Sequence, residues 1–381
     1  MFDRWPMIIC IELSPRTKSQ LDSLLEVGQY ADYSEAIAVA VANQLVLHGE
    51  AKSTRQNIVT PTQTTEREPA YTQGEATTSA TNGSGQQAAV GVPAIFGPVP
   101  EKAQIKTVPF PNDSFAVGQD VPVDRWIFGQ HNKLLPVKAT CRALANLMLR
   151  DKASRDGLPL QKAGAEVASD AAILGGFLQF LDEKFQAHRD DALAFAFPAA
   201  GATNEDKSRL RYANQFVASF SKQGTLTGLP VELKLVNRDH SRNPRLLLTE
   251  AGLQLARLQN PILDEKGEKG IAARFTPEEV DFFVQHIREH VPAEDFAFRS
   301  VLGAVADGAN SPESLDDALE KFVTKREDKP YTRAFLTTQR AGVVSRLIDL
   351  GLMQRVREGV NVKYEVTAKG SDLAAVAVPR G

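Results

Sequence analysis

The sequence predicts a mainly α-helical chain with a few small β-ribbons. Apolar residues recur at helical spacing in most of the dense segments, and short apolar strands come in pairs around polar turns. The composition also changes sharply at residues 51–92, where Gln, Thr, Ser, Ala and Gly dominate. Because 381 residues exceed one ordinary core, we expect a head (1–50), a flexible linker (51–92) and two helical units (93–258 and 274–376).

Charge and cysteine usage limit the possible classes of protein. A formal net charge of −3 excludes a globally basic nucleic-acid coat, so any such contact must come from local patches. Cys10 and Cys141 lie far apart, form no metal pattern and fit a reducing cytoplasm. No apolar run approaches the ~18 residues that a membrane span needs. We expect a cytoplasmic protein without membrane contact, metal or cofactor.

The head has one strand and two helices. Residues 7–13 are rich in β-branched residues, Ser14-Pro15 is typical of a helix N-terminus, and residues 28–33 interrupt the helix before Ser34-Glu35-Ala36-Ile37 begins another. Elements this short cannot bury a core alone, so a partner chain is implied.

These pieces resemble the ribbon-helix-helix proteins of the Arc, MetJ and CopG kind. The resemblance covers Ile9-Cys10-Ile11-Glu12-Leu13-Ser14 and the segment from Gly28 to Ile37. It implies a homodimer through residues 7–49, in which two strands pair antiparallel and the ribbon enters the DNA major groove. The implied dimerisation residues are Ile9, Ile11, Leu13, Ile37 and Val41.

The strand face opposite this core carries Ile8, Cys10 and Glu12, which are poor groups for reading bases. Residues 1–50 hold three Lys and Arg against seven Asp and Glu, a local charge of −4. Phosphate repulsion follows from that charge. A head that only dimerises is therefore at least as well supported as one that binds an operator.

The first unit opens with proline-punctuated extended segments and continues with helices and a ribbon. Helices are predicted at 135–149, 160–168, 171–188 and 206–222, strands at 230–236 and 245–248 around a polar turn, and a helix at 250–258 capped by Thr249.

The second unit repeats this order. Thr276-Pro277 and Ser311-Pro312 begin helices, a helix spans 332–350, strands follow at 352–356 and 362–366, and Thr367 caps a closing helix. The stretch beginning at Thr249 aligns with that beginning at Thr367, an offset of 118 residues. Helix, two-stranded ribbon and closing helix resemble the C-terminal half of a winged-helix domain, so we expect two such units in tandem.

Positive charge gathers around both ribbons. Residues 207–258 carry nine Lys and Arg against three Asp and Glu, and residues 325–370 carry ten against five. A winged helix would place its helix in the major groove and its wing on the backbone or minor groove of double-stranded DNA. The candidate DNA contacts are Lys207, Arg209, Arg211, Asn214, Gln215, Arg238, His240 and Arg242 in the first unit, and Arg333, Thr337, Thr338, Gln339, Arg340, Arg346, Arg357 and Lys363 in the second.

One motif points to a different chemistry. His286, Glu289 and His290 match the His-x-x-Glu-His spacing of inverted zinc peptidases, but no third-ligand context accompanies them. Two histidines on an amphipathic helix are far commoner, and no other catalytic motif is found. We expect a non-enzymatic DNA-binding protein, either a transcriptional regulator or a plasmid or mobile-element factor. The alternatives are a protein-binding subunit of a larger nucleic-acid or defence complex and, remotely, the peptidase.

Overall fold

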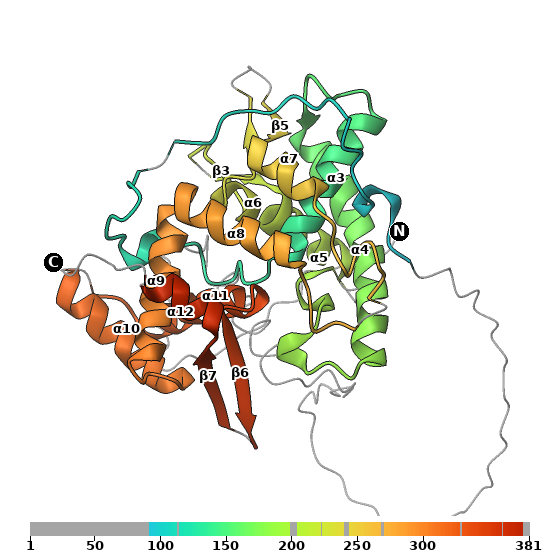
Figure 1. Cartoon of the computed structure of the whole chain (residues 1–381). Coiled ribbons are helices and arrows are strands. Elements are labelled where there is room, and N and C mark those ends of the chain that lie inside the picture. Colours follow the sequence, from blue (N-terminus) through green and yellow to red (C-terminus); the bar gives the residue numbers. More distant parts are fainter. Residues whose placement is uncertain are drawn as a thin grey trace, which may run out of the picture. The chain divides into compact units, whose positions relative to one another are not determined.

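The computed structural model describes residues 91–375, except positions 113, 199–203, 222, 240–243, 268–269, 328–329 and 360. The predicted head, its dimerisation residues (Ile9, Ile11, Leu13, Ile37 and Val41) and the linker as far as residue 90 lie outside the described residues. Within the described part, the prediction of a mainly helical chain with small antiparallel ribbons is confirmed (Figure 1).

Residues 135–258, which we call the first half, contain five α-helices and five short strands among their described positions. The helices are α3 (Leu135–Arg150), α4 (Leu160–Lys184), α5 (Glu205–Tyr212), α6 (Leu229–Glu232) and α7 (Glu250–Arg257), and a π-helical turn, η5 (Ala213–Val217), follows α5. The strands are β1 (Leu158–Pro159), β2 (Ser219–Phe220), β3 (Leu226–Thr227), β4 (Val236–Arg238) and β5 (Arg245–Leu248). Short 3-10 turns lie at η1 (Ala94–Phe96), η2 (Val123–Arg125), η3 (Arg189–Asp191) and η4 (Ala194–Ala196).

The strands of the first half form two antiparallel sheets. The larger sheet has the order β1-β5-β4, with Leu158 opposite Leu246 and Val236 opposite Leu248. The smaller is the β2–β3 hairpin. Because β5 is central and nearly all buried, its leucines form part of the core.

Residues 277–375, the second half, contain α8 (Pro277–His290), α9 (Pro292–Ala306), α10 (Pro312–Arg326), α11 (Arg333–Asp349) and α12 (Ala368–Ala375), with strands β6 (Met353–Glu358) and β7 (Asn361–Val366). The β6–β7 hairpin projects away from the helices (Figure 1). A backbone hydrogen bond from Tyr364 N–H to the Asn310 carbonyl ties β7 to the loop between α9 and α10. In the first half, the corresponding position between α3 and α4 is occupied by β1.

The same local geometry occurs at both closing helices. The Thr249 hydroxyl donates to the Lys234 carbonyl and accepts from the Gly252 N–H. The Thr367 hydroxyl likewise donates to the Gly351 carbonyl and accepts from the Gly370 N–H. Lys234 and Gly351 both have positive φ, at 57° and 65°. The repeat predicted from the offset of 118 residues therefore extends to hydrogen bonds and backbone conformation.

Residues 121–134 lie along α11, and we call them the strap. Where the strap crosses the helix, a Cβ on Gly129 would come within 1.9 Å of the Thr338 carbonyl oxygen, and one on Gly342 within 2.4 Å of the Gly129 oxygen. The two backbones are thus in direct contact, which only glycine permits. The strap therefore covers a face of α11 that the sequence assigned to DNA.

Three predicted element boundaries are wrong. The segments 160–168 and 171–188 form one continuous helix, α4. The helix predicted at 206–222 ends at Tyr212 and passes through the π-helical turn to extended backbone at Ala218. The strand predicted at 230–236 begins as α6, because Gly228 takes φ 124° and Pro230 starts a helical turn. In the described part of the chain, no helix is both long and apolar enough to cross a bilayer.

Candidate nucleic-acid interface

The exposed face of α5 carries the basic residues predicted for the first unit. Glu205 and Asp206 occupy the first turn, where carboxylates favour the positive end of the helix dipole. Lys207 and Arg211 are four residues apart and lie on one face of α5. Asn214 follows in the π-helical turn, and all three side chains are exposed. Neither Lys207 nor Arg211 forms an ion pair with another described residue.

Two other candidates on this segment are less available. The Arg209 guanidinium donates to Glu205 at 2.7 Å across one helical turn, which offsets its charge. Gln215 is half-buried within the π-helical turn. The open donors of this surface are therefore Lys207, Arg211 and Asn214.

Strand β4 and the β2–β3 hairpin contribute a second group. The Arg238 guanidinium lies 5.3 Å from the ring centroid of Phe220, a residue that is 39% exposed. An exposed aromatic ring under an arginine is a surface on which a sugar or base could stack. His240 and Arg242, at the predicted wing tip, lie outside the described residues.

Arg346 of α11 lies in the core and not on a DNA-facing surface. Its side chain is fully buried and pairs with both carboxylate oxygens of Glu294, at 2.5 and 2.9 Å, while a third contact reaches the His131 carbonyl of the strap at 2.5 Å. A bidentate buried pair of this kind fixes α9, α11 and the strap together. Arg346 is therefore not part of the candidate interface.

Gln339 and Arg340 are also buried. The Gln339 amide accepts from the Gly129 N–H at 2.6 Å and donates to the Val123 carbonyl at 3.0 Å, so it binds the strap. The Arg340 guanidinium donates to Asp316 at 2.8 Å. The sequence predicted both residues on an exposed, DNA-contacting face of α11. Their burial shows that this prediction is wrong.

The remaining candidates of the second half are at the surface but have acceptor partners. Arg333 donates to Asp317 at 2.8 Å, and Thr337 donates to Asp316 at 2.8 Å. Thr338 donates to a carbonyl of its own helix, that of Ala334.

The ribbon of the second half is neutralised in the same way. Arg357 pairs with Asp190 at 2.8 Å, and Lys363 pairs with Glu358 at 2.8 Å. Carboxylates beside these cations reduce their attraction for phosphate. Of the two basic regions, the first half therefore offers the more open cationic surface.

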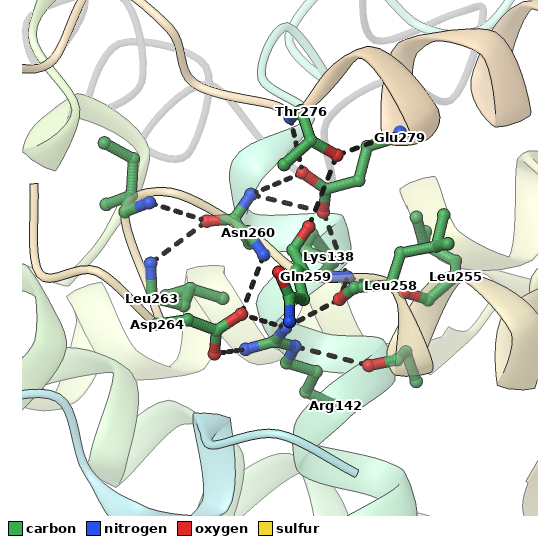
Figure 2. Close-up of polar contacts among 12 residues, drawn as sticks. Lys138, Arg142, Leu255, Leu258, Gln259, Asn260, Leu263, Asp264, Thr276 and Glu279 are labelled. Carbon is green, nitrogen blue, oxygen red and sulfur yellow. Dashed lines mark hydrogen bonds and ion pairs between the residues drawn. The ribbon is translucent and has the colours of Figure 1, made fainter. Parts of the chain in front are cut away.

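A buried polar cluster joins the two halves, and sequence reasoning missed it (Figure 2). Lys138 of α3 is fully buried and donates to the Leu255 and Leu258 carbonyls at 2.6 and 2.5 Å, with the Glu279 carboxylate 3.0 Å away. Glu279 also accepts from the Asn260 amide and closes a capping box with Thr276 at the start of α8. The available signal was a lysine and an arginine one turn apart within the mostly apolar α3.

That arginine, Arg142, forms the other side of the cluster. It binds both oxygens of Asp264, at 2.5 and 2.7 Å, and the Leu258 carbonyl at 2.7 Å (Figure 2). Burial lowers the pKa of Lys138 to about 8 and raises the pKa of Glu279. Since burial opposes both charges, their mutual contact is what retains them.

The His-x-x-Glu-His residues lie at the other end of α8. The His286 ring is buried, stacks on Phe282 and has Nε2 2.8 Å from the Leu233 carbonyl oxygen, to which it donates as the neutral tautomer. Burial lowers the pKa of His286 to about 4. His290 packs near the Phe110 ring, and Glu289 accepts from Gln285. Among the described residues, no three His, Cys, Asp or Glu side chains are grouped closely enough to hold a metal ion.

No protein-family model, curated protein or solved structure shows a significant match to this chain. Function is therefore inferred from the residues and their contacts alone.

Proposed function

We propose that this chain is a DNA-binding protein that contacts duplex DNA chiefly through its first half. In this proposal both halves are winged-helix units, and the head at residues 1–50 joins two chains into a dimer. The order α3, β1, α4, α5, β4, β5, α7, with η5, the β2–β3 hairpin and α6 inserted between α5 and β4, and the sheet order β1-β5-β4 support the winged-helix assignment. A transcriptional regulator or a plasmid or mobile-element factor would use DNA in this way.

The exposed row on α5 is the single observation that carries the proposal. Lys207 and Arg211 lack acidic partners among the described residues and can bind phosphates, while Asn214 can pair with the edge of an adenine. Arg238 would add a contact from the wing. The paired cations of the second half would contribute less, because DNA must displace their carboxylates first.

The test is binding of the full-length chain to a random-sequence duplex pool, followed by fluorescence anisotropy across a salt series. We expect affinity to fall steeply with salt. Lys207→Ala and Arg211→Ala should each weaken binding and reduce the salt slope by about 1, the effect of one lost phosphate contact. Arg155→Ala is the matched control, because Arg155 is an exposed arginine of the same half outside α5 and the wing. Full-strength binding by a Lys207→Ala, Arg211→Ala double variant would refute the assignment of this surface.

Dimerisation by the head has its own test. Removal of residues 1–50 should yield a monomer in sedimentation and weaken DNA binding through lost avidity. A truncated chain that still sediments as a dimer would exclude the head as the dimerisation element.

A second candidate function is a protein-binding subunit of a larger assembly. It is favoured by Ile173 and Phe180, which are both 54% exposed and lie seven residues apart on one face of α4. If the full-length chain has no affinity for duplex DNA even at low salt, this candidate replaces the first.

A further inference from the structure

A cleft of about 980 Å³ opens between α8, α9, α12 and the loop at residues 117–118. Its volume lies at the upper end of the range typical of small-molecule sites. Val280, Val284 and Leu352 provide an apolar wall, and Val117, which is 58% exposed, lies at the rim. The cleft is separate from the α5 surface, since none of its lining residues comes from the first half.

Most of the charged groups in the cleft are already paired. Lys369 lies 3.4 Å from Asp281, and Arg299 pairs with Asp295 across one turn of α9. Glu289 accepts from the Gln285 amide at 3.0 Å. These contacts account for two cations and three carboxylates of the lining.

Two charged side chains of opposite sign remain. Arg288 and Asp372 are exposed, and neither forms a direct ion pair with another described residue, although the charge of Arg288 acts on Asp295. They leave the lining with one open cation and one open anion. A purely anionic or purely cationic ligand would leave one of them unmatched.

Arg299 adds a donor that lacks an acceptor. Its side chain is 9% exposed, and its Nε–H has no hydrogen-bond partner in the described part of the chain. The Nε–H groups of Arg209 and Arg257 share this condition, but only Arg299 of the three lines the cleft. A buried donor without a partner is unfavourable. Because this nitrogen has almost no accessible surface, it does not itself select the ligand of the cleft.

We propose that this cleft binds a small zwitterion with an apolar body, the chemistry of an apolar amino acid or a short apolar peptide. The ligand carboxylate accepts from the exposed Arg288 guanidinium. The ligand ammonium meets Asp372, and the apolar body packs on Val280 and Val284. The site is independent of DNA binding, so either proposal can fail alone.

The test uses the full-length chain and four probes of related shape, measured by titration calorimetry. Leucine and leucyl-leucine carry both charges at different separations, 4-methylpentanoate carries only the carboxylate, and 3-methylbutylamine only the ammonium. We expect at least one zwitterion to bind roughly tenfold more tightly than either singly charged probe, because each charged contact contributes about that factor. Whichever zwitterion binds better shows whether the site takes an amino acid or a peptide.

Two variants assign the contacts. Arg288→Ala should weaken binding of the better zwitterion roughly tenfold or more. Asp372→Asn should reduce the affinity for this zwitterion to the affinity for 4-methylpentanoate. Both positions are exposed, so the fold should persist, and unchanged thermal melting checks this. Arg155→Ala should bind as the unaltered chain does. No saturable binding by either zwitterion up to about 10 mM, or equal binding by the singly charged probes or by Arg288→Ala, would overturn the proposal.

Discussion

Replacing Lys138 by Met tests the buried cluster at the junction of the two halves. Methionine keeps the length and apolar stem of the side chain but removes the ammonium. The Leu258 carbonyl still accepts from Arg142, and the Leu255 carbonyl still accepts from the Leu258 N–H. The loss therefore falls mainly on the Glu279 carboxylate, which is 0% exposed and keeps only neutral donors.

A buried charge that loses its partner destabilises a protein by about 3–5 kcal/mol. We expect a loss of that size at pH 7.5, measured by urea denaturation followed by circular dichroism. Because burial already raises the pKa of Glu279, its carboxyl should protonate more readily in the variant. The folded form then binds the proton more tightly than the unfolded form, so the loss should shrink as the pH falls toward 5.

The double variant Lys138→Met, Glu279→Gln is the control. With both charges gone, no unpaired carboxylate remains, and the double variant should be more stable than Lys138→Met alone. A loss below about 1 kcal/mol in Lys138→Met, or a double variant that is no more stable, would refute the view that this pair holds the junction.

Three further predictions concern His286 and two glycines, Gly370 of the second half and Gly176 of the first. Burial lowers the pKa of His286 from 6.5 to about 4, so the unfolded form binds more protons than the folded form between these values. The contribution of His286 to stability should be complete above pH 6.5 and decrease by about 3 kcal/mol as the pH falls to 4. Urea midpoints across this range should show the decrease, and a His286→Gln variant with the same pH dependence would contradict the assignment. Gly370→Ala places a Cβ within 2.0 Å of the Leu352 carbonyl oxygen and should destabilise by several kcal/mol. A Cβ on Gly176, within α4, would meet no other atom within 4 Å, so Gly176→Ala should stabilise the protein by roughly 0.5–1 kcal/mol. Similar changes in melting temperature for the two glycine variants would show that the contact between Gly370 and Leu352 is unimportant.

Local capping chemistry was readable from the sequence. Thr276 and Ser311, each followed by proline, begin α8 and α10 as predicted, because a side chain bonding to backbone three residues away needs no distant partner. The same holds for Thr249 and Thr367, whose hydroxyls bond the N–H groups three residues on.

The roles of the polar residues on α11 were not readable. Gln339 and Arg346 look like surface residues in a one-dimensional pattern, but their partners in the strap lie more than 200 positions earlier in the chain. Gly342 was the available signal, since a glycine inside a long helix often marks the close approach of another backbone. Charge alone could not separate core arginines from surface ones.

The exposure of the basic residues on α5 could be read from their spacing, whereas their role as DNA contacts stays a prediction. Lys207 and Arg211 share one face of α5 because they are four residues apart, and that spacing is a property of the sequence itself. The cleft was not predicted, because Arg288, Asp372 and Leu352 come from separate elements.

The contact between Gly129 and Gly342 also bears on how the chain is made. The Gly129 N–H and its Gln339 acceptor are 210 residues apart in the chain. At a synthesis rate of about 5–20 residues per second, α11 is therefore made roughly 10–40 s after the strap. The groups that α11 will cover stay without their final partners for that time. For the same reason a fragment limited to residues 274–376 would lack the strap, and adding a peptide of residues 121–134 in trans should be needed to restore a native-like second half.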